Sequence, residues 1–161
     1  MDLSDLVIAA QRGDTMAMND LLDELSPYVS RLCGAIALQH GADAAQETLI
    51  AVFRNLGRLR EPSALYGWVR AIAAREAVRT AHRFAPGLEL AEMAAGGDVE
   101  LAVDVRDALD RLSPEHRAVL VLRDLEGMDE QQAAAVLDVP QGTVKSRLHR
   151  ARSSFRKAWG R

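Results

Sequence analysis

The segment Glu126–Leu148 reads EGMDEQQAAAVLDVPQGTVKSRL, and its pattern decides the fold of the C-terminal part of the chain. Asp129 is a favourable N-cap for a short helix, and Pro140 suits the first turn of a second helix. Two short helices joined by a tight turn are typical of a helix-turn-helix, which lays its second helix in the major groove of DNA. The segment therefore predicts helices over residues 129–136 and 140–158.

The second of these helices has one apolar and one polar face. Val144 and Leu148, four residues apart, would pack against the first helix, where Ala133 is small enough for a close approach. The polar face carries groups that can reach base edges: Gln141, Thr143, Lys145, Ser146, His149 and Arg150. Later basic residues suit phosphates: Arg147, Arg152, Arg156 and Lys157. A helical hairpin with a basic surface and no DNA partner is the alternative that this pattern leaves open.

Charge is strongly segregated along a chain whose formal net charge is only −3. Residues 54–83 hold seven basic and two acidic residues, and residues 139–161 hold seven basic and no acidic ones. Residues 1–53 and 84–138 are acidic, with net charges of −6 and −9. Two basic blocks, each closing a helical unit, indicate a polyanionic partner despite the acidic total. Solvated helix faces are the simpler alternative for either block alone.

The composition of the 161 residues is that of a soluble, mostly helical protein. Apolar residues make up 48%, but only seven residues are aromatic, which favours helices over a sandwich or barrel. We expect an all-α fold of two small helical bundles joined by a flexible linker. The sequence contains neither a signal-peptide pattern nor a transmembrane stretch, and its single cysteine excludes an internal disulfide. A cytoplasmic location is therefore expected, with no membrane association.

Helical spacing of apolar residues also runs through the N-terminal half. The expected helices begin near Leu3, at the cap Asp14, at Ser26–Pro27, at Asp43 and at Ala64. Phe53 is expected on the apolar face of the helix that Asp43 opens, and residues 57–63 are expected to form a loop. Residues 84–98 hold three glycines, a proline and no basic residue, which predicts a linker. Helices over residues 99–111 and 114–126 would follow.

Two C-terminal segments, Leu112–Gly127 and Gly142–Arg152, resemble region 4 of the extracytoplasmic-function sigma factors. The resemblance implies a domain that binds the −35 promoter element and the flap of the RNA polymerase β subunit. The positions that match the family's −35-reading residues are Lys145, Ser146, His149 and Arg150. Their neighbours Thr143 and Arg147 complete the candidate −35 contacts.

The N-terminal half resembles region 2 of the same family. Asp43, Gln46 and Glu47 lie at i, i+3 and i+4 and therefore share one helix face, which by itself fits an ordinary acidic helix start. The resemblance implies that this face docks on the coiled coil of the polymerase β′ clamp. Together the two resemblances divide the chain into a region 2-like domain over residues 1–83, the linker over 84–98, and a region 4-like domain over 99–161.

One departure from the family pattern concerns the helix after Ala64. Where the family usually has asparagine and aspartate, this chain has Arg75 and Arg79, which favour phosphate contacts but leave base-specific recognition of the −10 element open. Trp68 fits either a stacking wedge at melted DNA or an ordinary core residue. The candidate residues for −10 binding and promoter melting are Arg60, Ser63, Trp68, Arg75 and Arg79.

The sequence holds no catalytic constellation, so we expect no enzymatic activity. The four histidines are scattered, and no cofactor or metal site is expected. Cys33 lies between apolar residues and is expected to be a buried small hydrophobe.

The leading hypothesis is a sigma factor whose partners are RNA polymerase core and promoter DNA. An anti-sigma factor is a further partner that the resemblance implies. A sigma-like regulator or adaptor that does not melt promoters is the first alternative, motivated by Arg75 and Arg79. A helical interaction protein with no DNA dependence is the second.

Overall fold

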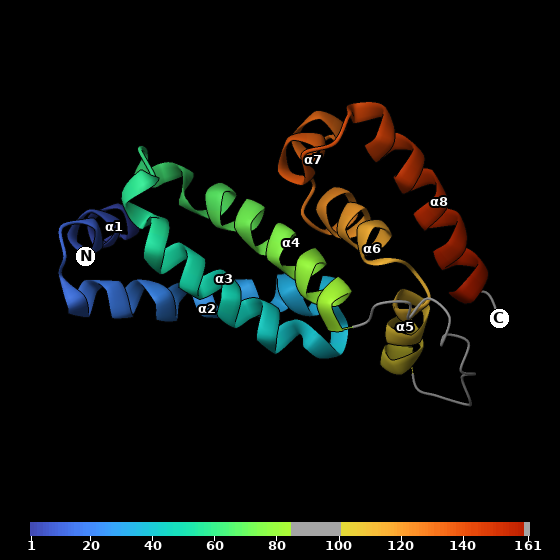
Figure 1. Ribbon diagram of the computed structural model, residues 1–161, viewed down its shortest axis with the longest axis horizontal. Helices are drawn as coiled ribbons and strands as arrows, with labels where there is room; N and C mark the ends of the chain where they lie inside the picture. The colour runs from blue at the N-terminus through green and yellow to red at the C-terminus, as the bar shows by residue number, and fades with distance from the viewer. Residues whose placement is uncertain (85–100, 160–161) are drawn as a thin grey trace.

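The computed structural model describes residues 1–84 and 101–159, and within these ranges it contains helices and turns but no β-strand (Figure 1). The all-α prediction is confirmed. We call residues 1–84 the first module and residues 101–159 the second module. The predicted linker lies outside the described residues except for Phe84, which is the last residue of a helix.

The first module is built on three mutually packed helices: α2 (Thr15–Ala37), α3 (Gly41–Asn55) and α4 (Leu65–Phe84). A short helix, α1 (Leu3–Gln11), packs against α2. Asp14 caps α2 as predicted, because its side chain accepts a hydrogen bond from the Ala17 amide. The three long helices place both candidate sites of this module on the outside of one bundle.

The helix α2 does not restart at Ser26–Pro27, so that expectation is wrong. Pro27 lies inside one continuous helix. Proline lacks the amide that would donate to the carbonyl one turn earlier, and one backbone hydrogen bond is therefore missing. The helix continues because Leu25 and Val29, on either side of the proline, are fully buried in the bundle.

The connection between α3 and α4 consists of two 3-10 turns, Leu56–Arg58 and Pro62–Ala64. It corresponds to the loop expected over residues 57–63. Gln11 of α1 holds this connection in place, because its side-chain amide donates to the carbonyls of Leu56 and Leu59, at 2.9 Å in each case.

The second module contains α5 (Leu101–Asp110), α6 (Pro114–Leu120), α7 (Glu130–Leu137) and α8 (Gln141–Trp159). The helix expected over 114–126 is α-helical only to Leu120 and continues as a π-helical turn over Val121–Leu125. Its cap is as predicted, since the Ser113 hydroxyl accepts a hydrogen bond from the His116 amide. The helices α5, α6 and α7 all pack on α8.

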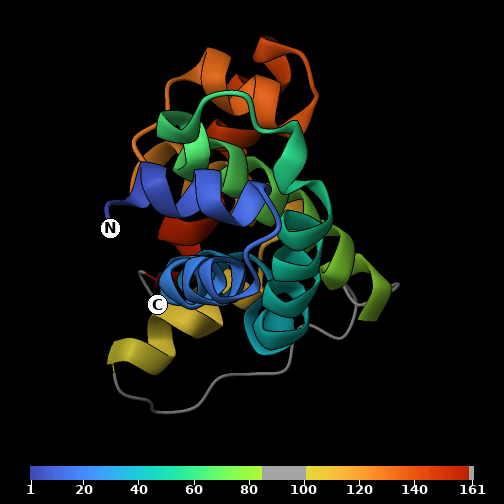
Figure 2. The same cartoon turned by 90° about the vertical axis from the view of Figure 1, so that its left-hand side faces the viewer.

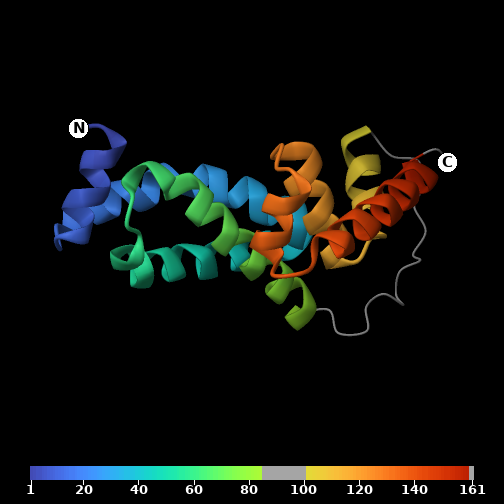
Figure 3. The same ribbon diagram turned by 90° about the horizontal axis from the view of Figure 1, so that it is seen from above.

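The two modules lie against each other rather than apart. Helices α6 and α7 contact α4, and α6 and the π-helical turn contact α2. The end-on and top views show the second module next to α2 and α4 of the first (Figures 2 and 3). One continuous cluster of buried residues runs through both modules.

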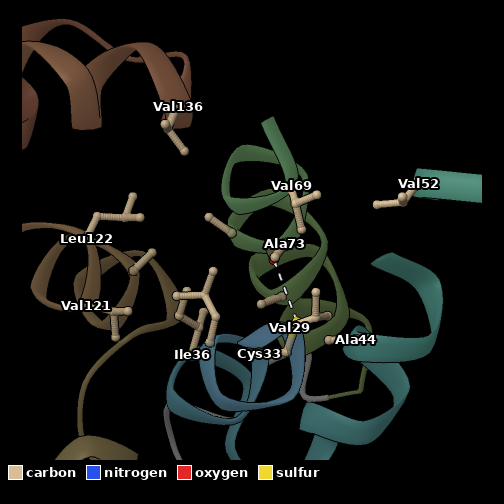
Figure 4. Packing of buried hydrophobic residues seen from close by; sticks show 14 of the residues in the cluster. Val29, Cys33, Ile36, Ala44, Val52, Val69, Ala73, Val121, Leu122 and Val136 are labelled. Atoms are coloured by element: carbon tan, nitrogen blue, oxygen red, sulfur yellow. Dashed lines mark hydrogen bonds between the residues drawn. The ribbon is translucent and has the colours of Figure 1, made fainter. Parts of the chain in front are cut away.

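The close view of this cluster shows Ile36 of α2 near Val121 and Leu122 of the second module (Figure 4). Cys33 lies deeper in the same cluster and is fully buried, as expected. Burial raises the pKa of its thiol to about 11. None of the described helices is both long and apolar enough to cross a membrane.

Candidate nucleic-acid interface

Helices α7 and α8 form the predicted helix-turn-helix. A capping box starts α7, in which the Asp129 carboxylate accepts from the Gln132 amide at 2.7 Å and the Gln132 side chain accepts from the Asp129 amide at 3.0 Å. The turn reverses at Asp138, whose φ of 57° is left-handed. Val144 and Leu148 of α8 are buried, as the apolar spacing predicts, and α8 packs against both α6 and α7.

The polar face of α8 is open to solvent at most of the predicted −35 positions. Lys145, Ser146, His149 and Arg150 are exposed, whereas Thr143 is half-buried. The Ser146 hydroxyl donates to the Thr143 carbonyl of its own helix at 3.1 Å, so an outside partner would meet it mainly as an acceptor. The exposed four lie within two turns of one helix, a length that fits a major groove.

Arg147 points elsewhere. It is half-buried and lines a cavity of about 320 Å³ between the modules, together with Arg75 and Arg79 of α4. Glu115 of α6 lines the same cavity. Three arginines predicted for two different DNA elements thus share one cavity in this arrangement.

The end of α8 carries the remaining basic residues. Arg156 and Lys157 are exposed. Arg152 forms an ion pair with Asp124 of the π-helical turn, and the hydrogen bonds that it donates to this carboxylate raise the pKa of the guanidinium above its ordinary value. Because the pair is exposed, phosphate oxygens can compete for Arg152 at little cost.

The five −10 candidates do not form one cluster. Arg60 and Ser63 are exposed in the connection before α4, whereas Arg75 and Arg79 lie on the second half of that helix, roughly 20 Å further along. Trp68 is half-buried and packs against the core cluster. Arg79 pairs with Glu76 of its own helix at 2.9 Å.

The predicted polymerase-binding residues lie together on α3. Asp43, Gln46 and Glu47 are all exposed on one face of the helix. Ile50 and Phe53 extend this face, being 37% and 58% exposed. The expectation that Phe53 lies on the buried side of the helix is wrong, because Thr48 and Val52 occupy the buried side instead.

Two ionisable residues in the first turn of α6, Glu115 and His116, have pKa values below their ordinary values. Burial opposes ionisation of Glu115, but a hydrogen bond with His82 of α4 and backbone hydrogen bonding hold the pKa of its carboxyl below the ordinary value. Burial also lowers the pKa of His116, with the nearby Arg147 and Arg150 acting in the same direction. The neutral form of His116 is therefore favoured next to the candidate DNA helix.

Sequence reasoning missed the residues that join the two modules. Arg75 donates to the carbonyl of Val136, 61 residues away, and Tyr28 donates to Glu126, 98 residues away. No local spacing signals such pairs. Among the described residues, no group of three or more histidine, cysteine or carboxylate side chains is placed to hold a metal ion.

Comparison with known proteins bears on both modules. Residues 102–154 match the family described as "Sigma-70, region 4". The RNA polymerase sigma-H factor of Pseudomonas aeruginosa is 33% identical, over 95% of this chain and 91% of its own length. The ECF RNA polymerase sigma factor SigE of Mycolicibacterium smegmatis is also 33% identical over 89% of this chain, which spans 63% of that longer relative.

Solved structures show the same fold. CnrH, in a complex with the cytosolic domain of CnrY, has a TM-score of 0.64 at 23% identity. The match covers 95% of this chain and 94% of the CnrH chain. The sigma factor RpoE of Bartonella quintana, in a complex with the anti-sigma factor NepR, has a TM-score of 0.64 at 22% identity, covering 87% and 96%. The chain belongs to the extracytoplasmic-function group of the sigma-70 family of RNA polymerase sigma factors.

Proposed function

We propose that this protein is a promoter-specificity subunit that directs bacterial RNA polymerase to its start sites. The observation that carries the proposal is the exposed face of α8, the second helix of the helix-turn-helix, which presents Lys145, Ser146, His149 and Arg150. Such a face can donate to base edges of a −35 element, while the end of the helix reaches phosphates. The matched family supplies the expectation that this DNA is a promoter.

The polymerase contact would lie on the other module. Asp43, Gln46 and Glu47 provide carboxylate and amide groups for a basic, hydrogen-bonding partner surface, and the exposed Ile50 and Phe53 add apolar area beside them. This combination of an apolar patch with polar groups at its edge is typical of protein interfaces. We assign it to the β′ clamp of the polymerase, and the second module to the β flap.

Arginine-rich contacts along α4 and its preceding loop would act on the −10 region. Arg60 and Ser63 are exposed and would contact a displaced strand, and the half-buried Trp68 would stack on a base of that strand. Arg75 and Arg79 would contribute phosphate contacts. Because one of the two similar solved structures is a complex with an anti-sigma factor, we also propose that an anti-sigma factor controls this chain in the cytoplasm.

Run-off transcription with purified core polymerase tests this function. The purified chain is added to core polymerase and to genomic fragments enriched by the resulting holoenzyme. Initiation from specific fragments supports the proposal, and binding without initiation would instead favour an adaptor that does not melt promoters. No association with core polymerase would contradict both.

A matched pair of charge reversals tests the polymerase face. Glu47→Lys should weaken co-purification with core polymerase, because it places a cation where an acidic face meets a basic partner. Asp20→Lys makes the same change at an exposed position of α2, outside the proposed face, and should leave binding unchanged. Equal losses in the two variants would show that the overall charge, not this face, governs binding.

A further inference from the structure

Four side chains that can donate hydrogen bonds form a row along one face of α8. Lys145, His149, Arg152 and Arg156 are spaced by three or four residues, so they follow one another along the helix, and all four are exposed. Arg152 lies about 10 Å along the axis from Lys145 at about 1.5 Å per residue. The major groove is about 12 Å wide, so a helix whose first turns reach base edges brings Arg152 near the phosphates at the edge of the groove.

Arg152 differs from the other basic residues of α8 because a carboxylate holds its guanidinium. Its Nε donates to Oδ2 of Asp124 at 3.1 Å, and its Nη2 donates to Oδ1 at 2.5 Å. No other basic side chain of α8 forms an ion pair within the part of the chain that the structure describes. Asp124 therefore occupies an edge of the guanidinium that is suited to bidentate binding of a phosphate.

The π-helical turn places Asp124 beside α8. Val121 is buried, and in a regular α-helix Leu125 would lie on the same face, four residues later. The turn is wider than that, because the Glu126 amide donates to the Val121 carbonyl, five residues back, at 2.8 Å. Leu125 is 73% exposed as a result. Asp124, which precedes it, is also exposed and reaches Arg152 on α8.

This carboxylate changes what α8 offers to a polyanion, a step that rests on the proposed function. Sequence-independent binding to DNA comes from phosphate contacts that release counterions, and it weakens as salt rises. A phosphate that binds Arg152 must displace Asp124. The carboxylate then lies unpaired near the DNA and attracts a cation, which offsets the counterion that the phosphate released. The contact therefore adds little to the affinity.

We propose that Asp124 limits the sequence-independent attraction of α8 for DNA by occupying the guanidinium of Arg152. Lys145 and Arg150 keep their donors for the promoter. The free chain then binds DNA of arbitrary sequence less tightly than the seven basic residues of the block 139–161 suggest. On the polymerase, the second module is held close to the promoter, and the raised effective concentration compensates for the lost contact.

Salt-dependent binding of the full-length chain to DNA tests this role of Asp124. Fluorescence anisotropy measures the Kd for a labelled duplex without promoter elements, over a range of about 50 to 200 mM salt. Asp124→Asn should tighten binding about threefold, the size of effect expected from an exposed ion pair. The slope of log Kd against log salt should steepen by about 0.9, because one further phosphate contact releases its counterion. Arg152→Ala should act in the opposite direction and weaken binding.

Asp107→Asn is the matched control for this measurement. Asp107 pairs with Arg111 of the same module at 3.2 Å and is as exposed as Asp124, but Arg111 lies outside α8. The net charge changes by the same amount, so affinity and slope should stay close to those of the wild type. Asp124→Glu keeps the carboxylate and should retain the wild-type slope. Equal gains in Asp124→Asn and Asp107→Asn, or weaker binding in Asp124→Asn, would overturn the proposal.

Run-off transcription separates this proposal from the proposed function, because the anisotropy measurement uses no polymerase. A chain that does not initiate with core polymerase, but whose Asp124→Asn variant shows the steeper salt slope, refutes the proposed function alone. A chain that initiates, but whose Asp124→Asn variant binds DNA no better than the wild type, refutes the role of Asp124 alone. The two proposals therefore fail in distinguishable ways.

Discussion

Gly41 lies against Gly34 so closely that a Cβ added at Gly41 would stand 2.7 Å from the Gly34 Cα and 3.0 Å from its amide nitrogen. Gly41 begins α3, and Gly34 lies in the last turns of α2. The backbone contact sets how closely these helices approach, and so fixes the base of the helix that carries Asp43, Gln46 and Glu47.

A Cβ would clash at Gly41 but not at Gly34, so alanine substitutions at the two positions form a matched pair of variants. Gly41→Ala should destabilise the protein by about 1–3 kcal/mol, because backbone atoms must move apart. Gly34→Ala should be neutral or stabilising by up to about 1 kcal/mol, since a Cβ there meets nothing within 4 Å and alanine favours the helix. Urea unfolding measures both changes, and equal destabilisation in the two variants would contradict this packing.

Gln11 offers a test of the connection before α4. Gln11→Ala leaves the carbonyls of Leu56 and Leu59 without their side-chain donor, so a loss of about 1–2 kcal/mol in the free energy of unfolding is expected. Amide hydrogen exchange should speed up at Leu59 and Ala64 in particular, both of which donate within this connection. Gln131→Ala, at an exposed position of α7, is the control and should change neither measurement.

The thiol of Cys33 should be unreactive in the native state. It is fully buried, and burial raises its pKa to about 11, so very little thiolate forms near neutral pH. A thiol reagent should react only at the rate of opening of the first module, and rapidly in urea. A Ser30→Cys variant, exposed one turn earlier on α2, should show one fast thiol per chain. Fast reaction of the unmodified native chain would rule out the buried placement.

The lowered pKa of His116 predicts a stability that falls with acidification. Because its pKa in the folded state lies below the ordinary value of 6.5, the unfolded chain binds more protons near pH 6. The contribution of His116 to the free energy of unfolding is fully present above about pH 6.5. It is lost as the pH drops through the pKa that His116 has in the folded state. His116→Gln should lose less stability than the wild type between pH 7.5 and 5.5.

The same two-pH comparison on Gln11→Ala is the control for this effect, because that change removes no titrating group. Its pH dependence should match the wild type although its stability is lower. A wild-type stability that is constant or rises toward pH 5.5 would contradict the prediction. Glu115 acts in the same direction, but only at pH values below this window, since its pKa is lowered from 4.5.

Alanine variants of two exposed residues of α8 test whether the second module contacts DNA through bases or through phosphates. Lys145→Ala and Arg150→Ala should each reduce transcription from a responsive promoter about fivefold or more, corresponding to about 1–3 kcal/mol of lost contact. If the side chain contacts a base, the loss will depend on the −35 sequence. If it contacts a phosphate, its removal will weaken binding to all sequences and lower the salt dependence of binding. Arg31→Ala removes an exposed charge from α2 and should have little effect. Unchanged transcription in both α8 variants would favour a protein without DNA dependence.

Much of the local structure was predictable because it depends on neighbouring residues. Asp14, Ser113 and Asp129 each cap the helix that follows, as their positions before apolar spacing indicate. The helix-turn-helix and the shared exposed face of Asp43, Gln46 and Glu47 follow from the helical repeat in the same way. These features need only a few consecutive turns of chain.

Burial reverses two of the local expectations. Pro27 would end an isolated helix, but the burial of Leu25 and Val29 keeps α2 continuous. Phe53 has the character of a core residue, yet the bundle buries Val52 in its place. In both cases the choice depends on which helix face the neighbouring helices cover, and periodicity alone does not supply that information.

The sequence alone therefore determined most of the helices, the caps Asp14, Ser113 and Asp129, the two basic blocks and the family resemblance. Only the tertiary structure decided that Arg75 meets Val136, that Arg117 meets Ile36, and that the two modules share one buried cluster. The reason is physical: a cap or an amphipathic face is set by residues a turn apart. A contact between residues 61 or 81 positions apart depends on how whole helices dock.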